Sequence, residues 1–204
     1  MNCLLCDKRM DDQPTWQQLL GIMRDATVCP PCFERFDRID RIEEDDILDS
    51  VHSLYAYNEQ ARDYVHQFKF MQDIALANVF AGELRSVLRD SKKIIVPIPM
   101  HPNNKKNRTF SQVDALLDAA KLPYEHYIRK TTESVMGEKT RAQRLEMTEL
   151  FEATADIIRN EKIFILVDDI YTTGTTLRHA ATALKSKGAE RVEAVTLFRP
   201  IREK

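Results

Sequence analysis

The sequence has little that would place the chain in a membrane or in a common nucleotide-binding class. No apolar run approaches the roughly 20 residues that a membrane-spanning helix needs. The first residues carry no basic stretch followed by an apolar one, as a targeting signal would. Neither a Walker A sequence nor a dinucleotide-binding fingerprint is present. We therefore expect a cytoplasmic protein without membrane insertion, and we exclude P-loop and dinucleotide-binding proteins.

Cysteine is scarce, because the 204 residues contain four and all of them lie near the N-terminus. Cys3, Cys6, Cys29 and Cys32 form two Cys-x2-Cys knuckles, the usual ligand pattern of a structural Zn²⁺ site with four thiolates. Disulfides are the main alternative, but thiols stay reduced in the expected compartment. Because so short a ribbon has little core, the metal would stabilise it directly. We expect loss of one cysteine to unfold the ribbon and to leave the rest of the chain folded.

Charge is unevenly spread along the chain, although the net charge is only −2. Residues 1–90 hold 10 Lys and Arg against 17 Asp and Glu, whereas residues 91–204 hold 20 against 15. This split indicates either a C-terminal part that attracts anions or an ordinary solvated surface. With 43% hydrophobic and 30% charged residues, the composition is that of a globular protein. The length suffices for one sizeable α/β domain and a small additional module.

The most informative stretch runs from residue 163 to residue 176 and reads Ile-Phe-Ile-Leu-Val-Asp-Asp-Ile-Tyr-Thr-Thr-Gly-Thr-Thr. Its first five residues are all apolar, which predicts a strand buried on both faces, as in a parallel sheet. Asp168 and Asp169 follow at the carboxyl end of that strand, where open α/β sheets bind ligands. A helix is predicted to begin at about Thr175, after a glycine that permits a tight turn. Its N-terminal amides and the neighbouring threonine hydroxyls are suited to a phosphate group.

Two adjacent carboxylates are unexpected beside a phosphate site. At a separation of ~4 Å and an effective dielectric constant of ~20, like charges repel by roughly 4 kcal/mol. Asp168 and Asp169 therefore need partners such as sugar hydroxyls or a Mg²⁺ ion. A ligand with a phosphate at one end and a vicinal diol at the other, such as a ribose 5-phosphate, satisfies both halves of the stretch. The alternative is a strand end followed by ordinary helix capping.

Residues 166–176 resemble the motif that binds phosphoribosyl pyrophosphate (PRPP) in type I phosphoribosyltransferases. Taken with the cysteine knuckles, nearly the whole chain resembles the ComF family of late competence proteins. The resemblance implies an α/β fold with the mostly parallel sheet of a type I phosphoribosyltransferase and a small N-terminal four-cysteine zinc ribbon. It implies that Asp168 and Asp169 are the catalytic pair that meets the ribose hydroxyls, with Mg²⁺ accompanying PRPP. The implied ligands of the 5-phosphate are Thr172, Thr173, Gly174, Thr175 and Thr176.

Two basic segments resemble loops that contact PRPP in these proteins. The first ends in Arg-Thr-Phe-Ser-Gln at residues 108–112, where the ComF pattern is roughly Arg-Gly-Phe-Asn-Gln. The second, residues 130–144, resembles the flexible loop that closes over PRPP, without the family's glutamine near Met136. The alternatives are an exposed basic loop and an unstructured connection. The pyrophosphate and loop candidates are Lys105, Lys106, Arg108, Lys139 and Arg141.

The remaining patterns predict how the chain is divided. Residues 33–49 have a helical pattern and are expected to join the ribbon to the main domain. Further elements are predicted as strands over 51–57, 94–98 and 192–198, and as helices over 59–70, 74–88, 111–120 and 176–187. We expect the zinc ribbon with its linker at 1–45 and the phosphoribosyltransferase-like domain at 46–204. Lys69 resembles a lysine typical of the ComF family and is equally well explained as a surface lysine.

The resemblance implies a PRPP-binding protein that acts in natural transformation and handles incoming single-stranded DNA. It also implies partners in the competence machinery, such as a DNA-translocating helicase, that dock on the zinc ribbon. The sequence leaves open whether the chain is a Mg²⁺-dependent phosphoribosyltransferase. The alternative function is an active phosphoribosyltransferase or glycosyltransferase of nucleobase or amine metabolism without a role in DNA uptake.

Overall fold

Five strands build the central sheet of the computed structural model, which describes residues 1–10, 27–90, 93–100, 109–130, 150–154 and 163–201. The strand order is β1-β2-β7-β6-β3. The strands are β1 (Arg38–Glu43), β2 (Ser50–Ala56), β3 (Lys93–Pro97), β6 (Ile163–Ile170) and β7 (Arg191–Arg199). Neighbouring strands are parallel except for β1, which runs antiparallel to β2 at the edge. The expected α/β fold with a mostly parallel sheet is confirmed.

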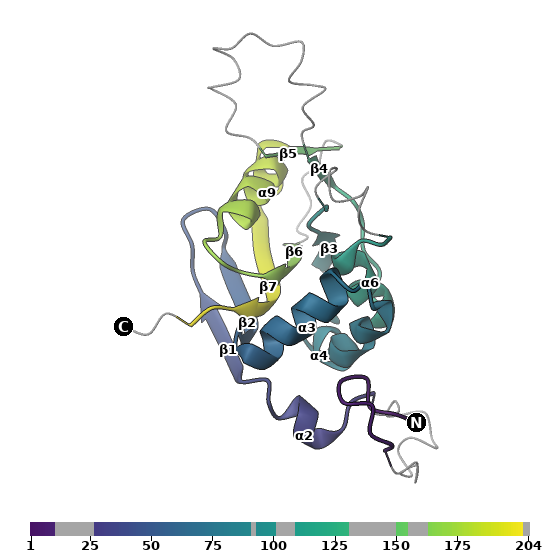
Figure 1. Cartoon of the computed structure of the whole chain (residues 1–204). Helices are drawn as coiled ribbons and strands as arrows, with labels where there is room; N and C mark the ends of the chain where they lie inside the picture. Colours follow the sequence, from purple (N-terminus) through teal and green to yellow (C-terminus); the bar gives the residue numbers. More distant parts are fainter. Residues whose placement is uncertain (11–26, 91–92, 101–108, 131–149, 155–162, 202–204) are drawn as a thin grey trace, which may run out of the picture.

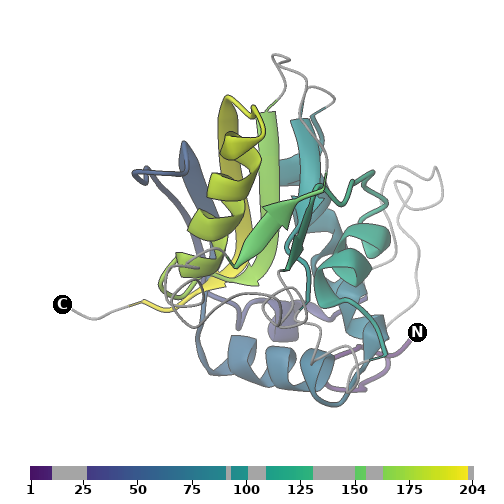
Figure 2. The same ribbon diagram turned by 90° about the horizontal axis from the view of Figure 1, so that it is seen from above.

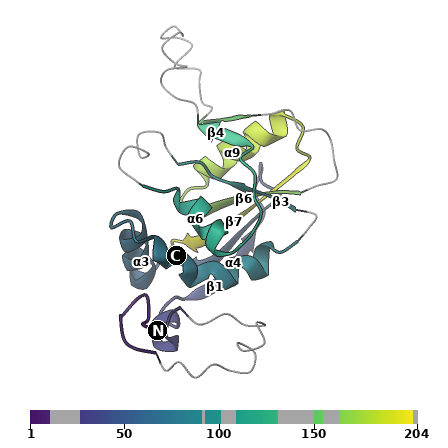
Figure 3. The same ribbon diagram turned by 90° about the vertical axis from the view of Figure 1, so that its right-hand side faces the viewer.

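Both faces of the sheet are covered, as the apolar run of β6 predicts. On one face, Ile165 and Val167 pack against the helices α3, α4 and α6 and the 3-10 helix η1; on the other, Phe164 and Leu166 pack against α9. Figure 3 shows α9 on one side of the sheet and α3 and α4 on the other. The helices are α3 (Glu59–Lys69), η1 (Ile74–Phe80), α4 (Ala81–Leu88), α6 (Gln112–Ala119) and α9 (Thr175–Ser186). None of the helices in the described ranges is long and apolar enough to cross a membrane.

A short hairpin that the sequence did not predict lies on the α9 face of the sheet. Strand β4 (Ile128–Lys130) pairs antiparallel with β5 (Phe151–Ala153). Ile128 and Phe151 join the apolar cluster beneath α9, and Figure 2 shows the hairpin beside that helix. The predicted loop over 130–144 begins at the end of β4, and its remaining residues lie outside the described ranges.

The N-terminal cysteine region packs against the core of the α/β domain. Cys3, Cys32 and Phe36 belong to the same buried cluster as Phe80 and Phe198. The ring of Phe36 lies 5.0 Å from that of Phe80 and 6.1 Å from that of Phe198, centroid to centroid. In Figure 1 this region, with α2 (Pro30–Phe33), lies at the foot of the molecule, far from α9.

The helix expected over 33–49 is wrong, because residues 38–43 form the edge strand β1. Pairing with the backbone of β2 overrides the weak helical pattern, and the strand is irregular: its register shifts between Arg38 and Arg41, and Asp40 has a φ of 40°. The division of the chain into 1–45 and 46–204 stays a proposal, in which the first part supplies one strand to the sheet of the second.

Candidate functional site

A pocket of about 180 Å³ lies between the carboxyl ends of β3 and β6. Strand β3 is followed by α6 on one face of the sheet, and β6 is followed by α9 on the opposite face. Ligands of open α/β sheets bind where successive connections leave for opposite faces in this way. The pocket is lined by residues from several elements and their flanks. They are Lys69 at the end of α3, residues 98–100 after β3, residues 111–113 at the start of α6, Lys130 of β4, and Asp168, Asp169 and Thr176 at the end of β6 and the start of α9.

The acid pair, Asp168 and Asp169, is part of this lining. Asp169 is buried, with 8% of its surface exposed, and its carboxylate forms an ion pair with Lys69. Asp168 is partly exposed, and its Oδ1 accepts a hydrogen bond of 2.9 Å from the backbone N–H of Asp169. Burial raises the pKa of Asp168 well above its usual range, and the adjacent Asp169 raises it further. The pocket therefore favours ligands that bring hydroxyl donors or a cation to these two carboxylates.

Gly174 makes the turn between β6 and α9 possible. Its φ of 76° is in the left-handed region, and a Cβ at this position would lie 2.5 Å from the hydroxyl oxygen of Tyr171. The ring of Tyr171 is itself buried, with the guanidinium of Arg199 4.4 Å from its centroid. The buried ring of Tyr171 therefore packs against the turn and supports it.

The threonines of the predicted phosphate site surround the N-terminus of α9. Thr176 lines the pocket, whereas Thr172, Thr173 and Thr175 are exposed on the turn that leads to it. The hydroxyls of Thr173 and Thr175 lie 2.9 Å apart. The N-cap residue of α9 is Gly174, which has no side chain to cap the helix, so the amides of the first turn are suited to an anion.

Arg178 holds this turn in place and was not singled out from the sequence. Its guanidinium donates a hydrogen bond of 3.0 Å to the carbonyl oxygen of Thr173 and one of 2.8 Å to Asp45. Asp45 also accepts the backbone N–H of Ile47 at 3.1 Å. Burial would raise the pKa of Asp45, but these donors outweigh it and keep the pKa below its usual range. The partners are far apart in the chain, so no local pattern could have revealed the contact.

The basic residues proposed from sequence are not part of the described structure: Lys105, Lys106, Arg108, Lys139 and Arg141 all lie outside the described ranges. Two other lysines line the pocket. Lys69 carried a signal through its resemblance to a family lysine, whereas Lys130 was not singled out. Burial lowers the pKa of Lys130, and the charge of Asp168 opposes that shift.

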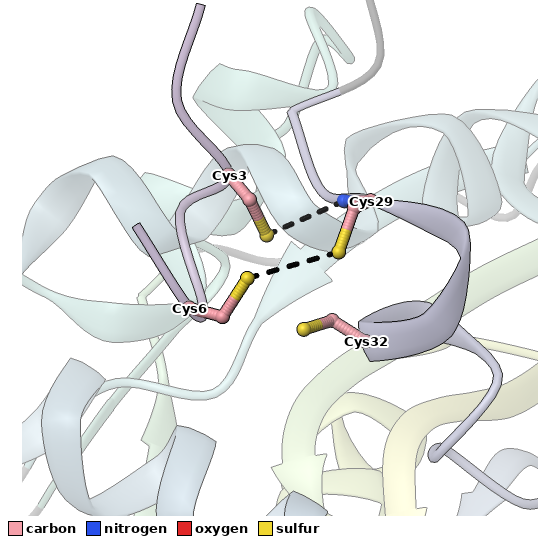
Figure 4. Close-up of side chains that lie close together, drawn as sticks. All are labelled: Cys3, Cys6, Cys29 and Cys32. Carbon is pink, nitrogen blue, oxygen red and sulfur yellow. Dashed lines mark hydrogen bonds between the residues drawn. The ribbon is translucent and has the colours of Figure 1, made fainter. Parts of the chain in front are cut away.

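The four cysteines converge at the N-terminal end of the chain, as Figure 4 shows. Their sulfur atoms all lie within 4.8 Å of one another, and those of Cys6 and Cys29 are 3.8 Å apart. A tetrahedral zinc ion with Zn–S bonds of ~2.3 Å requires sulfur atoms about 3.8 Å apart. The arrangement therefore fits a closed site with four thiolates, which would link the two knuckles.

Backbone amides already surround one of these sulfurs. The Sγ of Cys3 accepts hydrogen bonds from the N–H groups of Cys29 (3.3 Å) and Leu5 (3.5 Å). Burial alone would raise the pKa of Cys3, but the surrounding N–H groups outweigh it and lower the pKa to about 6. Stabilisation of a thiolate before any metal arrives is a further reason why these residues suit a metal site.

Comparison with known proteins places the chain in a family. Residues 113–204 match the model of the phosphoribosyl transferase domain. Competence protein ComFC of Streptococcus pneumoniae is 30% identical to this chain, over 98% of the chain and 100% of that protein. The chain belongs to the ComF family of competence proteins. Another member of the ComF family, competence protein ComFC of Bacillus subtilis, is 28% identical over 97% of the chain and 94% of that protein.

Among solved structures, APRTase from Giardia lamblia in complex with 9-deazaadenine is 13% identical to this ComF chain. The comparison covers 65% of this chain and 83% of that one, with a TM-score of 0.41. Within this ComF protein, the segment that matches the phosphoribosyl transferase domain includes the acid pair and α9. Lys69 and the four cysteines precede it.

Proposed function

We propose that this ComF protein binds Mg·PRPP, or a related ribose phosphate, in the pocket between β3 and β6. The observation that carries the proposal is that the acid pair and the N-terminus of α9, whose N-cap residue is Gly174, lie around one pocket. Asp168 and Asp169 accept the hydroxyls of the ribose, and the turn over 172–176 binds the 5-phosphate. The carboxylates of the acid pair would hold Mg²⁺ together with the sugar phosphate, and the ion would supply neutralising charge.

The same arrangement suits a transferase, which is the second candidate function. In that reaction the bond between C1 and pyrophosphate breaks, a nitrogen nucleophile bonds to C1, and the sugar passes through an oxocarbenium-like state. The chain would contribute by positioning the ribose and by neutralising charge on the departing pyrophosphate. The proposed contacts of that leaving group are the basic residues of the predicted loops, namely Lys105, Lys106, Arg108, Lys139 and Arg141.

Incubation of the protein with Mg·PRPP and a panel of nucleobases and amines tests both candidates. We expect calorimetry to show that PRPP binds, and that ribose without its phosphate binds far more weakly because the turn after β6 then has no ligand. Pyrophosphate release that depends on an acceptor would establish the transferase. Binding without release would leave a PRPP-binding protein, and absence of PRPP binding would contradict the proposal.

The competence names of the relatives support a role in natural transformation for this chain. We propose that it handles incoming single-stranded DNA and that partners in the competence machinery, such as a DNA-translocating helicase, dock on the cysteine region. The net charge of +5 over residues 91–204 supports contact with a phosphate backbone. The two positively charged segments thus have a second proposed ligand besides pyrophosphate.

Binding of a labelled oligonucleotide, followed by fluorescence anisotropy at several salt concentrations, tests the DNA proposal. We expect weak binding without sequence preference that falls steeply as salt rises, because backbone contacts release counterions. Changing Lys105, Lys106 and Arg108 together to Ala should weaken binding and flatten its salt dependence. An affinity unaffected by salt and by this triple substitution would show that the first basic segment does not contact DNA.

A further inference from the structure

Two ion pairs fasten helix α9 to the turn that joins β1 and β2. Near the start of the helix, Arg178 pairs with Asp45 at 2.8 Å, and the side chain of Asp45 is only 9% exposed. Near its end, Lys185 pairs with Asp49 at 3.2 Å, and both of these side chains are about one third exposed (34% and 35%). Of the two basic residues, Arg178 alone also reaches the turn before α9, where its guanidinium donates a hydrogen bond of 3.0 Å to the carbonyl oxygen of Thr173.

This hydrogen bond fixes the peptide unit between Thr173 and Gly174. In a trans peptide the C=O group and the N–H group that follows it point in opposite directions. Because the guanidinium of Arg178 holds the carbonyl oxygen on one side, the N–H group of Gly174 points to the other side of the turn. Within the described ranges this N–H group forms no backbone hydrogen bond. It is therefore oriented as a donor for an anion on the turn.

Asp45 leaves Arg178 poorly placed to bind an anion itself. The Nε and Nη2 atoms of Arg178 both lie 2.8 Å from Oδ2 of Asp45, and Nη1 donates to Thr173, so each nitrogen of the guanidinium has a partner. Asp45 also accepts the N–H groups of Ile47 (3.1 Å) and Leu48 (3.4 Å), which fix it within its own turn. A phosphate brought to this guanidinium would be repelled by the carboxylate beside it.

We propose that Arg178, held by Asp45, is a positioning residue that presents the N–H group of Gly174 to the 5-phosphate, an inference that rests on the proposed ribose-phosphate site. If the peptide unit rotated, a carbonyl oxygen would replace the donor and face the anion. Holding the peptide in place before the ligand arrives removes the cost of ordering it during binding. The site thereby extends to the turn between β1 and β2, which precedes the segment that matches the phosphoribosyl transferase domain.

Calorimetry with ribose 5-phosphate and with Mg·PRPP, on the wild type, Arg178→Met and Asp45→Asn, tests the inference. Methionine removes the donors of Arg178, and asparagine removes the charge that holds them. Both ligands carry the 5-phosphate, so both affinities should fall together, by about tenfold in Arg178→Met and by at least about threefold in Asp45→Asn. If Arg178 contacted the phosphate directly, Asp45→Asn would free it and the affinities would stay equal or rise.

The amide resonance of Gly174 supplies a readout that a merely structural role would not move. In the wild type, saturating ribose 5-phosphate should shift the proton of this amide downfield, because the N–H group donates to the phosphate. In Arg178→Met at saturation the shift should be at most about half as large, whereas the resonances of β6 keep their wild-type positions. If Arg178→Met does not fold, Arg178→Lys keeps the charge, loses the planar fork that reaches both partners, and carries the same expectation.

Lys185→Met is the matched control. Lys185 also joins α9 to the turn between β1 and β2, through Asp49, but it lies in the last turn of the helix, away from Gly174. The substitution removes the same charge from the same helix. Both affinities and the shift of the Gly174 resonance should equal those of the wild type.

Unchanged affinities in Arg178→Met would overturn the inference, and so would an Asp45→Asn variant that binds ribose 5-phosphate as tightly as the wild type. Equal losses in Arg178→Met and Lys185→Met would also overturn it, since Arg178 would then act only by keeping α9 in place. A wild type that binds neither ligand would overturn the proposed function and this inference together. A wild type that binds both while the Gly174 resonance does not move would overturn the inference alone.

Discussion

Replacing Asp168 and Asp169 together with Asn is expected to lower the affinity for Mg·PRPP by at least about tenfold. Asparagine preserves the shape of each side chain but removes its negative charge. Each hydrogen bond from a sugar hydroxyl to a charged carboxylate contributes roughly 1.5–3 kcal/mol, and 1.4 kcal/mol corresponds to a factor of ten in affinity. Calorimetry on the wild type and the double variant measures the effect, and equal affinities would refute the assignment of the acid pair.

Two controls separate this loss of binding from a loss of folding. Because burial raises the pKa of Asp168, its ionised form destabilises the native state. The stability that this carboxyl contributes is present below its unfolded pKa and is lost as pH rises towards its higher folded pKa. Asp168→Asn should therefore leave the free energy of unfolding at pH 7 equal or higher. The pair Glu59→Gln and Asp63→Asn changes charge equally on exposed side chains of α3 and should not affect PRPP binding.

Replacing Cys32 with Ser is expected to release bound zinc and to lower the thermal stability of the whole chain. Cys32 is buried, and it shares one apolar cluster with Phe36, Phe80 and Phe198. We therefore expect loss of the metal to disturb the domain core as well as the ribbon, whereas the sequence alone predicts that the ribbon unfolds by itself. A structural zinc site contributes several kcal/mol, and each kcal/mol shifts the melting temperature of a chain this size by about 2–4 °C. We expect one cooperative transition, at least about 10 °C lower.

Elemental analysis and thermal unfolding followed by circular dichroism measure these effects. A chelator should lower the melting temperature of the wild type to that of Cys32→Ser and should leave the variant unchanged. Wild-type protein purified without chelator that contains no zinc would contradict the metal site. A zinc-free variant that melts in two steps, with the upper step at the wild-type temperature, would contradict the shared core.

The main elements of the fold could be predicted because their signals are local. The apolar run over 163–167 is buried on both faces, and the helices begin after the capping residues Asn58 and Asp73, whose side chains accept backbone N–H groups. Gly174 also follows from local chemistry, since the turn before α9 requires a positive φ. Periodicity, caps and turn residues act over a few positions, and a single sequence displays them directly.

The rest depends on contacts between distant parts of the chain. β1 has a helical pattern and becomes a strand because β2 offers a free edge to it. The β4–β5 hairpin joins two segments separated by residues 131–149. The ion pair of Lys69 with Asp169 and the hydrogen bonds of Arg178 join residues that no pattern relates. The sequence could therefore indicate which residue types belong to the candidate site, but it could not place Lys69 beside Asp169.

The position of β7 determines when this chain can fold during its synthesis. β7 lies between β2 and β6 in the sheet, yet it follows both of them in the chain. Until residues 191–199 leave the ribosome, the β1–β2 pair and the β3–β6 pair have no strand to join them, and Phe36 lacks its contact with Phe198. A nascent chain that still lacks β7 therefore exposes two unpaired sheet edges and an incomplete aromatic core. We therefore expect the sheet to close only once β7 is available, and chaperones that shield strand edges to act on the nascent chain before that point.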